Sequence, residues 1–160
     1  MKHLLCLCFA LLCLVACAKQ SDNTIERNKQ AMYRFETMIN TADEALAEEL
    51  VAPDAPFYTP ASPKPLYGGK GYLSVVHWMR QSFSDVQWKL EEMVADEQKV
   101  AVRWTLTATH DGEFMGLAPT GKKIKTTVMN FYYFNKDGKI TNDIAADGMI
   151  GILRPLGLSK

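Results

Sequence analysis

Cysteine is missing from nearly all of this chain. All four cysteines, Cys6, Cys8, Cys13 and Cys17, lie within the first seventeen residues. The rest of the chain therefore has no disulfide, no thiolate nucleophile and no cysteine-ligated metal site. An oxidising compartment is tolerable for such a chain, but its stability does not require one.

An excess of charge of either sign is also missing. The chain has 18 basic and 18 acidic side chains, and removal of residues 1–16 would take away only Lys2, which leaves 17 and 18. This balance gives no basic surface, so we expect no nucleic-acid partner. The sequence has no Gly-rich phosphate loop, no G-x-S-x-G motif and no HExxH or EF-hand spacing. After residue 16 its only histidines are His77 and His110. We therefore expect no metal and no cofactor.

The apolar run at the N-terminus is too short to be a membrane span. It covers residues 4–16, whereas a transmembrane helix needs about 20 apolar residues. A basic start followed by an apolar stretch and small residues is typical of a secretory signal peptide. The closing LVAC also resembles the bacterial lipobox, in which the chain is cleaved before the cysteine and the thiol is diacylated. An ordinary signal peptide and a buried N-terminal helix are the alternatives.

The lipobox resemblance divides the chain into three predicted segments: a signal peptide over 1–16, the lipidated Cys17 with a tether over 17–24, and one domain over 25–160. Acyl chains such as palmitate bury many methylenes at ~0.8 kcal/mol each, and several chains on one residue give a stable membrane anchor. Ala18 follows the cysteine in place of the aspartate typical of inner-membrane retention. The predicted location is the bacterial cell envelope, at the outer membrane facing the periplasm.

Apolar periodicity predicts helices in the first half of the domain. The segments IERNKQAMYRFETMIN, TADEALAEELV and YLSVVHWMRQSF each place apolar residues at helical spacing. A residue between 22 and 24 would cap the first helix, and Thr41 or Asp43 would cap the second. Five prolines between residues 53 and 65 rule out a continued helix and predict a loop there.

From residue 86 the apolar period changes to two, which predicts strands. KIKTTVMNFYYF is apolar or aromatic on both faces near its end, so we expect both faces to be covered there. Asp137-Gly138, ahead of KITNDIAA, predicts a hairpin. Helices followed by an antiparallel meander predict an α+β domain, with a curved sheet wrapped around the N-terminal helices. KVAVRWTLTATH should turn one face toward the core, with Val100, Val102, Trp104, Leu106 and Ala108 on it.

Three stretches carry a family resemblance: LVAPDAPFY, VADEQKVAVRWTLTATHDGEFMGLAPTGKKI, and FNKDGKI with the following MIGILRPLG. They resemble the SnoaL-like polyketide cyclase or ester cyclase family, within the nuclear-transport-factor-like superfamily. The resemblance covers residues 28–157 and is most specific over 104–121. It implies a cone-shaped barrel with an apolar small-molecule pocket. Because such cones commonly pair through the open face of the sheet, it also implies a homodimer.

The resemblance further implies a catalytic carboxylate near the end of the last strand, which serves as acid and base in an intramolecular aldol closure. Such a group needs a pKa raised by an apolar wall. Relatives read D-M-L-G-L-L where this chain reads GMIGIL, so Gly148 stands at the position of the family aspartate. Asp147 is the candidate base, with Asp143 as its substitute, and a helix N-cap is the competing interpretation of Asp147. His110 matches the family's T-H position and is the candidate partner, unless it is an ordinary core histidine.

Candidate ligand-binding residues are Tyr58 and Trp104, from their family positions, and Tyr33 and Phe131, from the aromatic inventory. The loop GEFMGLAPTGK either forms the pocket rim or folds its apolar residues back onto the core. Three functions remain open. The missing aspartate and the anchored location favour a non-catalytic domain that binds a small apolar molecule. The alternatives are a cofactor-free ester-cyclase-like enzyme (a cyclase, lyase or isomerase) and a protein-interaction module of the cell envelope.

Overall fold

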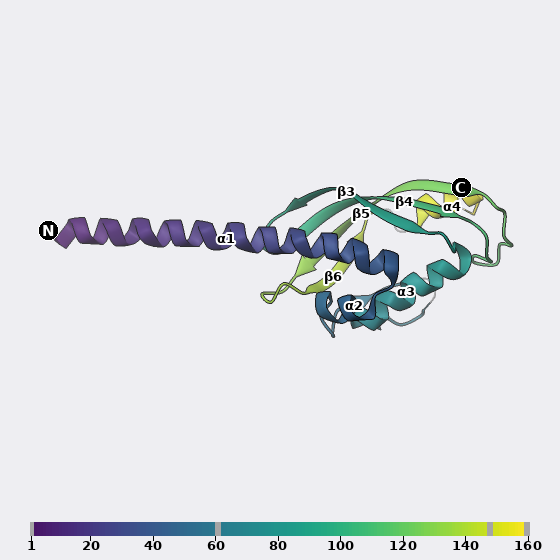
Figure 1. The fold of residues 1–160 in the computed structure, drawn as a ribbon, viewed down its shortest axis with the longest axis horizontal. Coiled ribbons are helices and arrows are strands. Elements are labelled where there is room, and N and C mark those ends of the chain that lie inside the picture. Colours follow the sequence, from purple (N-terminus) through teal and green to yellow (C-terminus); the bar gives the residue numbers. More distant parts are fainter. Residues whose placement is uncertain (1, 60–61, 147–148, 159–160) are drawn as a thin grey trace.

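The computed structural model describes residues 2–59, 62–146 and 149–158, with side chains from Gln20 onward. Within this described part, no helix is both long enough and apolar enough to cross a membrane. The elements in chain order (Figure 1) are α1 (Lys2–Thr41), α2 (Glu44–Leu50), β1 (Pro56–Phe57), β2 (Leu66–Tyr67), α3 (Gly68–Ser82), β3 (Gln87–Ala95), β4 (Lys99–Thr109), β5 (Lys123–Phe134), β6 (Ile140–Ala145) and α4 (Ile150–Leu156).

Strands β3 to β6 form one antiparallel sheet in chain order, and β1 pairs with β2 in a separate small sheet. Figure 1 shows the larger sheet curving over α1 and α3. The predicted hairpin joins β5 to β6: Gly138 has a φ of 82°, and the Asn135 side chain accepts hydrogen bonds from the N–H groups of Asp137 and Lys139. The predicted α+β class and the meander are therefore confirmed.

The core lies between α1 and the concave face of the sheet. The predicted inward face of β4 is confirmed, because its alternate side chains from Val100 to Ala108 are all buried. Helix α1 faces them with residues at helical spacing, among which Met32, Phe35 and Ile39 are buried. The two apolar periods read from the sequence thus meet in one core.

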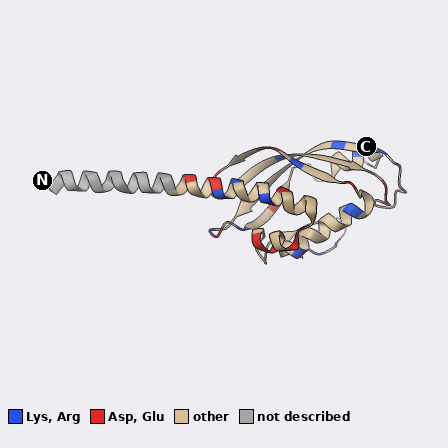
Figure 2. Ribbon diagram, in the orientation of Figure 1, with Lys and Arg blue, Asp and Glu red and all other residues tan. Residues whose placement is uncertain are grey.

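The sequence predicted that the first helix begins at residues 22–24, and this prediction is wrong. Helix α1 passes through this stretch, and the Thr24 hydroxyl donates a hydrogen bond of 3.1 Å to the Gln20 carbonyl. A threonine that bonds back to the carbonyl four residues earlier lies inside a helix and does not cap it. Figure 2 shows acidic and basic residues interspersed along the described turns that follow.

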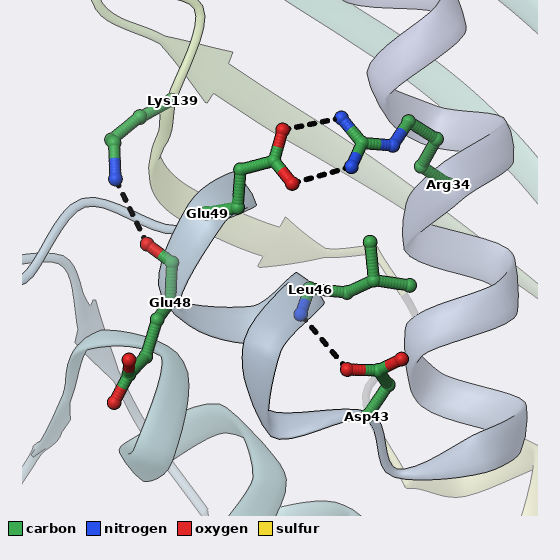
Figure 3. A network of polar contacts seen from close by, with 6 residues as sticks. All are labelled: Arg34, Asp43, Leu46, Glu48, Glu49 and Lys139. Carbon is green, nitrogen blue, oxygen red and sulfur yellow. Dashed lines mark hydrogen bonds and ion pairs between the residues drawn. The ribbon is translucent and has the colours of Figure 1, made fainter.

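Helix α2 is oriented by polar contacts with its surroundings (Figure 3). The predicted cap by Asp43 is confirmed, since its carboxylate accepts a hydrogen bond of 3.0 Å from the Leu46 N–H. The Arg34 guanidinium of α1 donates to both carboxylate oxygens of Glu49. Both side chains of this ion pair are exposed to solvent, so the pair orients the two helices more than it stabilises them.

The outer face of the sheet differs from the prediction that both faces are covered. Met129, Phe131 and Ile144 are 48%, 43% and 50% exposed, and Phe131 lies opposite Ile144 in the β5–β6 ladder. Their neighbours Asn130 and Tyr132 are buried on the concave side. We call Met129, Phe131 and Ile144 the outer patch.

Candidate functional site

A pocket of about 770 Å³ opens on the concave side of the sheet. Its volume is within the range of small-molecule sites, which is about 300–1,000 Å³. Helix α3 supplies one wall and the four strands of the large sheet supply another. Residues of α1, β1, the loop after β1 and α4 also contribute to the lining. Most of the lining is apolar, with Val76, Trp78, Met79, Trp88, Leu106 and Val128 among its members.

The charge of the pocket comes from one carboxylate. Asp143 is the charged residue among the described lining residues, which include no Lys, Arg or His. It lies on β6 directly opposite the buried Tyr132 of β5. Residues directly opposite each other in a ladder point to the same face of the sheet. The hairpin register therefore turns Asp143 inward.

Asp143 is held by neutral hydrogen-bond donors. The Asn130 side-chain amide donates a hydrogen bond of 2.8 Å to its Oδ1. Burial raises the pKa of the Asp143 carboxyl from its ordinary value of 3.8 to about 6, while the contacts with Asn130 and with the Tyr72 hydroxyl act to lower it. The chemistry available here is proton transfer, because such a carboxyl exchanges a proton near neutral pH.

Tyr72 of α3 and Tyr132 of β5 stand beside this carboxylate. Burial is the main cause that raises the pKa of each hydroxyl well above its ordinary value of 10, so both hydroxyls stay neutral and can donate hydrogen bonds. The Tyr72 ring packs edge-on against Phe35 and Phe57, with ring centroids 4.9 and 4.8 Å apart. These contacts fix where its hydroxyl points.

The predicted ligand-binding aromatic residues do not gather at the pocket. Tyr58 does line it, at an edge where the side chain is 78% exposed. Trp104 is buried behind the lining and packs on Phe35. Tyr33 and Phe131 face outward and do not belong to the lining. Each lies next to a buried position, on the exposed face of α1 or β5. The helical or strand periodicity therefore directs these two side chains away from the pocket.

His110 is buried against a second apolar cluster, which includes Phe83 and Phe114, and it does not line the pocket. The Thr120 N–H donates to its Nδ1 at 3.3 Å, and Thr120 Oγ1 lies 3.0 Å from the same atom. The ring packs against Phe83 and Phe114, and its Nε2 has no hydrogen-bond partner among the described residues. This environment is that of a core histidine, the alternative weighed from the sequence.

The loop after β4 folds back onto the core. Phe114 is buried against Phe83 and Trp78, and it exchanges two backbone hydrogen bonds of 3.0 Å with Leu117. Of the two interpretations of GEFMGLAPTGK, the structure supports the folded-back hairpin loop.

Asp147, the first candidate base, lies outside the described residues, and so does Gly148. The competing interpretation of Asp147, as the cap of the last helix, therefore also concerns a residue outside the described part. The N-cap position of α4 is occupied by Met149, which forms no side-chain hydrogen bond there. Asp143, named from the sequence as the substitute, is the carboxylate that lines the pocket. Among the described residues, no group of three or more His, Cys, Asp or Glu side chains could hold a metal ion.

Sequence reasoning missed Tyr72 and Asn130. Tyr72 has a detectable signal, because it is followed by the pocket residues Val76 and Met79 at helical spacing. Asn130 is a polar residue on the inward face of a strand whose neighbour at 132 is buried. An inward asparagine needs a hydrogen-bond partner, but the sequence could not identify that partner as Asp143.

Comparison with known proteins identifies the family. Residues 29–156 match the SnoaL-like polyketide cyclase family. The chain belongs to this family. The resemblance read from the sequence is thus confirmed, and this SnoaL-like domain occupies nearly all of the chain after residue 28. No curated protein matches it.

Solved structures show the same cone fold. IdmH from Streptomyces antibioticus, a proposed polyketide cyclase, is 26% identical with a TM-score of 0.66, over 81% of this chain and 98% of IdmH. AclR from Streptomyces galilaeus, a proposed hydroxylase, is 25% identical with a TM-score of 0.67, over 85% of this chain and 88% of AclR. A proposed polyketide cyclase from Acidithiobacillus ferrooxidans is 24% identical, with a TM-score of 0.66 over 84% and 96%. Two activities on one fold mean that function must be argued from the site.

The raised pKa of Asp143 predicts a pH-dependent stability. Its pKa is raised in the folded state, so between about pH 4 and 6 the folded chain binds more protons than the unfolded chain. The free energy of unfolding therefore falls as the pH rises through this window. A shift from 3.8 to about 6 corresponds to about 3 kcal/mol. We expect Asp143→Asn to raise the free energy of unfolding by up to about that amount at pH 8 and to have little effect at pH 4.

Urea unfolding at the two pH values measures this difference. Asp54→Asn is the matched control, because Asp54 is exposed and its replacement removes the same charge. An equal effect of Asp143→Asn at both pH values would contradict the prediction.

Proposed function

We propose that the SnoaL-like domain binds a neutral, largely apolar carbonyl compound, and that Asp143 removes a proton from the carbon next to the carbonyl. The observation that carries the proposal is a carboxylate with a pKa of about 6 in the wall of an apolar pocket. A general base is most effective when its pKa lies near the working pH. The neutral character of the ligand follows from the lack of a positively charged side chain in the described lining.

The proposed reaction has two proton transfers. The Asp143 carboxylate takes the proton from carbon, and the electron pair moves onto the carbonyl oxygen to give an enolate. If the enolate carbon attacks a second carbonyl of the same molecule, a carbon–carbon bond forms and an alkoxide develops. Asp143 then returns its proton to that oxygen, so the carboxylate is regenerated without a cofactor. If Asp143 instead returns the proton to another carbon of a conjugated enolate, the carboxylate is likewise regenerated and the outcome is isomerisation.

Non-catalytic binding of an apolar molecule is the second candidate. The observation in its favour is Gly148, which stands where the family resemblance expects the catalytic aspartate. Asp143 weakens this argument, because it offers a carboxylate to the same pocket from another position. An interaction module is less favoured, since the chain's own aromatic side chains leave the pocket open.

Exchange of carbon-bound protons tests the catalytic role without knowledge of the natural substrate. We expect the protein to accelerate deuterium exchange next to the carbonyl of 2-tetralone, a neutral aromatic ketone, as followed by proton NMR in D₂O. Asp143→Asn should reduce this acceleration by about 10²-fold or more, while binding, measured by fluorescence of the lining residues Trp78 and Trp88, stays within a few-fold.

Asp54→Asn should leave both measurements unchanged. Full exchange activity in Asp143→Asn would exclude Asp143 as the base. Binding without exchange in the unaltered protein would favour the non-catalytic candidate, and mass spectrometry of copurified molecules would then identify the ligand class.

We also propose that the chain is a lipoprotein anchored through Cys17, with residues 1–16 removed. The support is the sequence LVAC at the end of a short apolar run. Cys17→Ser is expected to release the protein from the membrane fraction or to leave an uncleaved precursor, as shown by fractionation and by the mass of the chain. Cys13→Ser is the matched control and should remain anchored. A Cys17→Ser protein that is still processed and membrane-bound would rule out this anchor.

A homodimer through the outer patch completes the proposal. Its support is the set of exposed apolar side chains on paired strands, which a second copy of the sheet would cover. Sedimentation of the Cys17→Ser protein at micromolar concentration should give twice the chain mass. Phe131→Glu should give a single chain, and Tyr33→Glu, an exposed control on α1, should not. A single-chain mass for the Cys17→Ser protein itself would count against the dimer.

A further inference from the structure

Behind Asp143 lies a series of polar side chains that leads from the pocket into the core. Tyr72 of α3 lines the pocket together with Asp143, and its hydroxyl interacts with the Asp143 carboxylate. Tyr132 of β5 lies directly opposite Asp143 in the β5–β6 ladder and interacts with the Tyr72 hydroxyl. Trp104 of β4 lies beyond it, and its indole N–H interacts with the Tyr132 oxygen although it lacks a hydrogen bond of standard geometry. Three elements therefore supply one connected series.

The chemistry of the two ends fixes the direction of every contact. An ionised carboxylate can only accept hydrogen bonds, and an indole N–H can only donate. The Tyr72 hydroxyl must then donate to Asp143, which leaves its oxygen to accept from the Tyr132 hydroxyl. The Tyr132 oxygen in turn faces the N–H of Trp104. All the donors point toward Asp143, and the Asn130 amide adds a further one at 2.8 Å.

The rings of this series are locked by aromatic packing. Phe35 of α1 contacts Tyr72 and Tyr132 edge-on, with ring centroids 4.9 and 5.1 Å apart. Trp104 stands edge-on to Tyr132 at 6.3 Å. A hydroxyl on a ring held from several sides has few directions available. The donors that meet Asp143 are therefore oriented before any ligand arrives.

We propose that Tyr72, supported by Tyr132, is a positioning residue for Asp143: its hydroxyl keeps the carboxylate ionised and turned toward the pocket. The inference rests on the proposed function of Asp143 as a base. A carboxylate that is removed from water without a cation nearby takes up a proton unless donors replace the lost hydration. No described Lys, Arg or His contributes to the electrostatic environment of Asp143. Tyr72 and Asn130 therefore supply this stabilisation.

A merely structural tyrosine would behave differently. If Tyr72 served only to fill space between Phe35 and Phe57, its replacement by phenylalanine would keep the ring contacts and leave the protonation of Asp143 unchanged. The functional hydroxyl is the single atom that Tyr72→Phe removes, so this variant separates the two roles.

The test is a pH titration of the Asp143 side-chain carbon by NMR. The sample is the full-length protein in detergent, ¹³C-labelled at the aspartate carboxyl carbons, and Asp143→Asn assigns the signal. The titration midpoint of the unaltered protein is expected near 6. Tyr72→Phe should raise it by about one unit, because a donor to the charged form is lost. Tyr132→Phe should raise it by less, since it acts through Tyr72.

Tyr67→Phe is the matched control, because Tyr67 is exposed and precedes the same helix, and it should leave the midpoint unchanged. An unchanged or lowered midpoint in a folded Tyr72→Phe protein would overturn the inference. Should that variant fail to fold, Tyr132→Phe decides the question by the same criterion. The titration needs no substrate. A raised midpoint together with absent exchange activity in the unaltered protein would therefore retain the positioning role and reject catalysis.

Discussion

The arrangement of this protein depends on one half-buried carboxylate, Asp143, which has neutral donors and no cation among the described residues that act on it. Placing an ionised aspartate in an apolar wall is unfavourable, and most proteins offset this with an arginine or a lysine. Here the compensation comes from an amide and a phenol hydroxyl, at Asn130 and Tyr72. The two kinds of partner differ in consequence. A cation would lower the pKa of Asp143 below the range that suits a base, whereas neutral donors leave it near 6.

The aromatic core gives these donors their positions. Phe35 touches Tyr72 and Tyr132, so one residue of α1 sets the spacing between α3 and the sheet. The same packing that stabilises the fold thus orients the groups at Asp143. Placing polar groups in this packed region lowers the stability of the fold, because each buried polar group must find its partner inside the protein.

Much of the fold could be predicted from the sequence, since the apolar periods directly report which residues face inward. The alternation from Val100 to Ala108 was enough to predict the inward face of β4, and the Asp137-Gly138 pair was enough to predict the hairpin. The start of α1 could not be predicted in this way, because a threonine such as Thr24 can form side-chain hydrogen bonds both inside a helix and at its cap. The site was harder to predict. Trp104 was assigned to the correct face, but no periodicity tells whether an inward side chain lines a cavity or lies behind it.

Asp143 shows where the limit of sequence reasoning lies. Its inward direction depends on its pairing with Tyr132, and that register depends on how many residues the hairpin contains. A comparison of family positions points instead to residue 148, where this chain has glycine. A pocket needs a carboxylate at a place in space, and neighbouring strand positions can supply it from different residues. The loss of a family residue at one position therefore says little about activity until the remaining carboxylates have been located around the cavity.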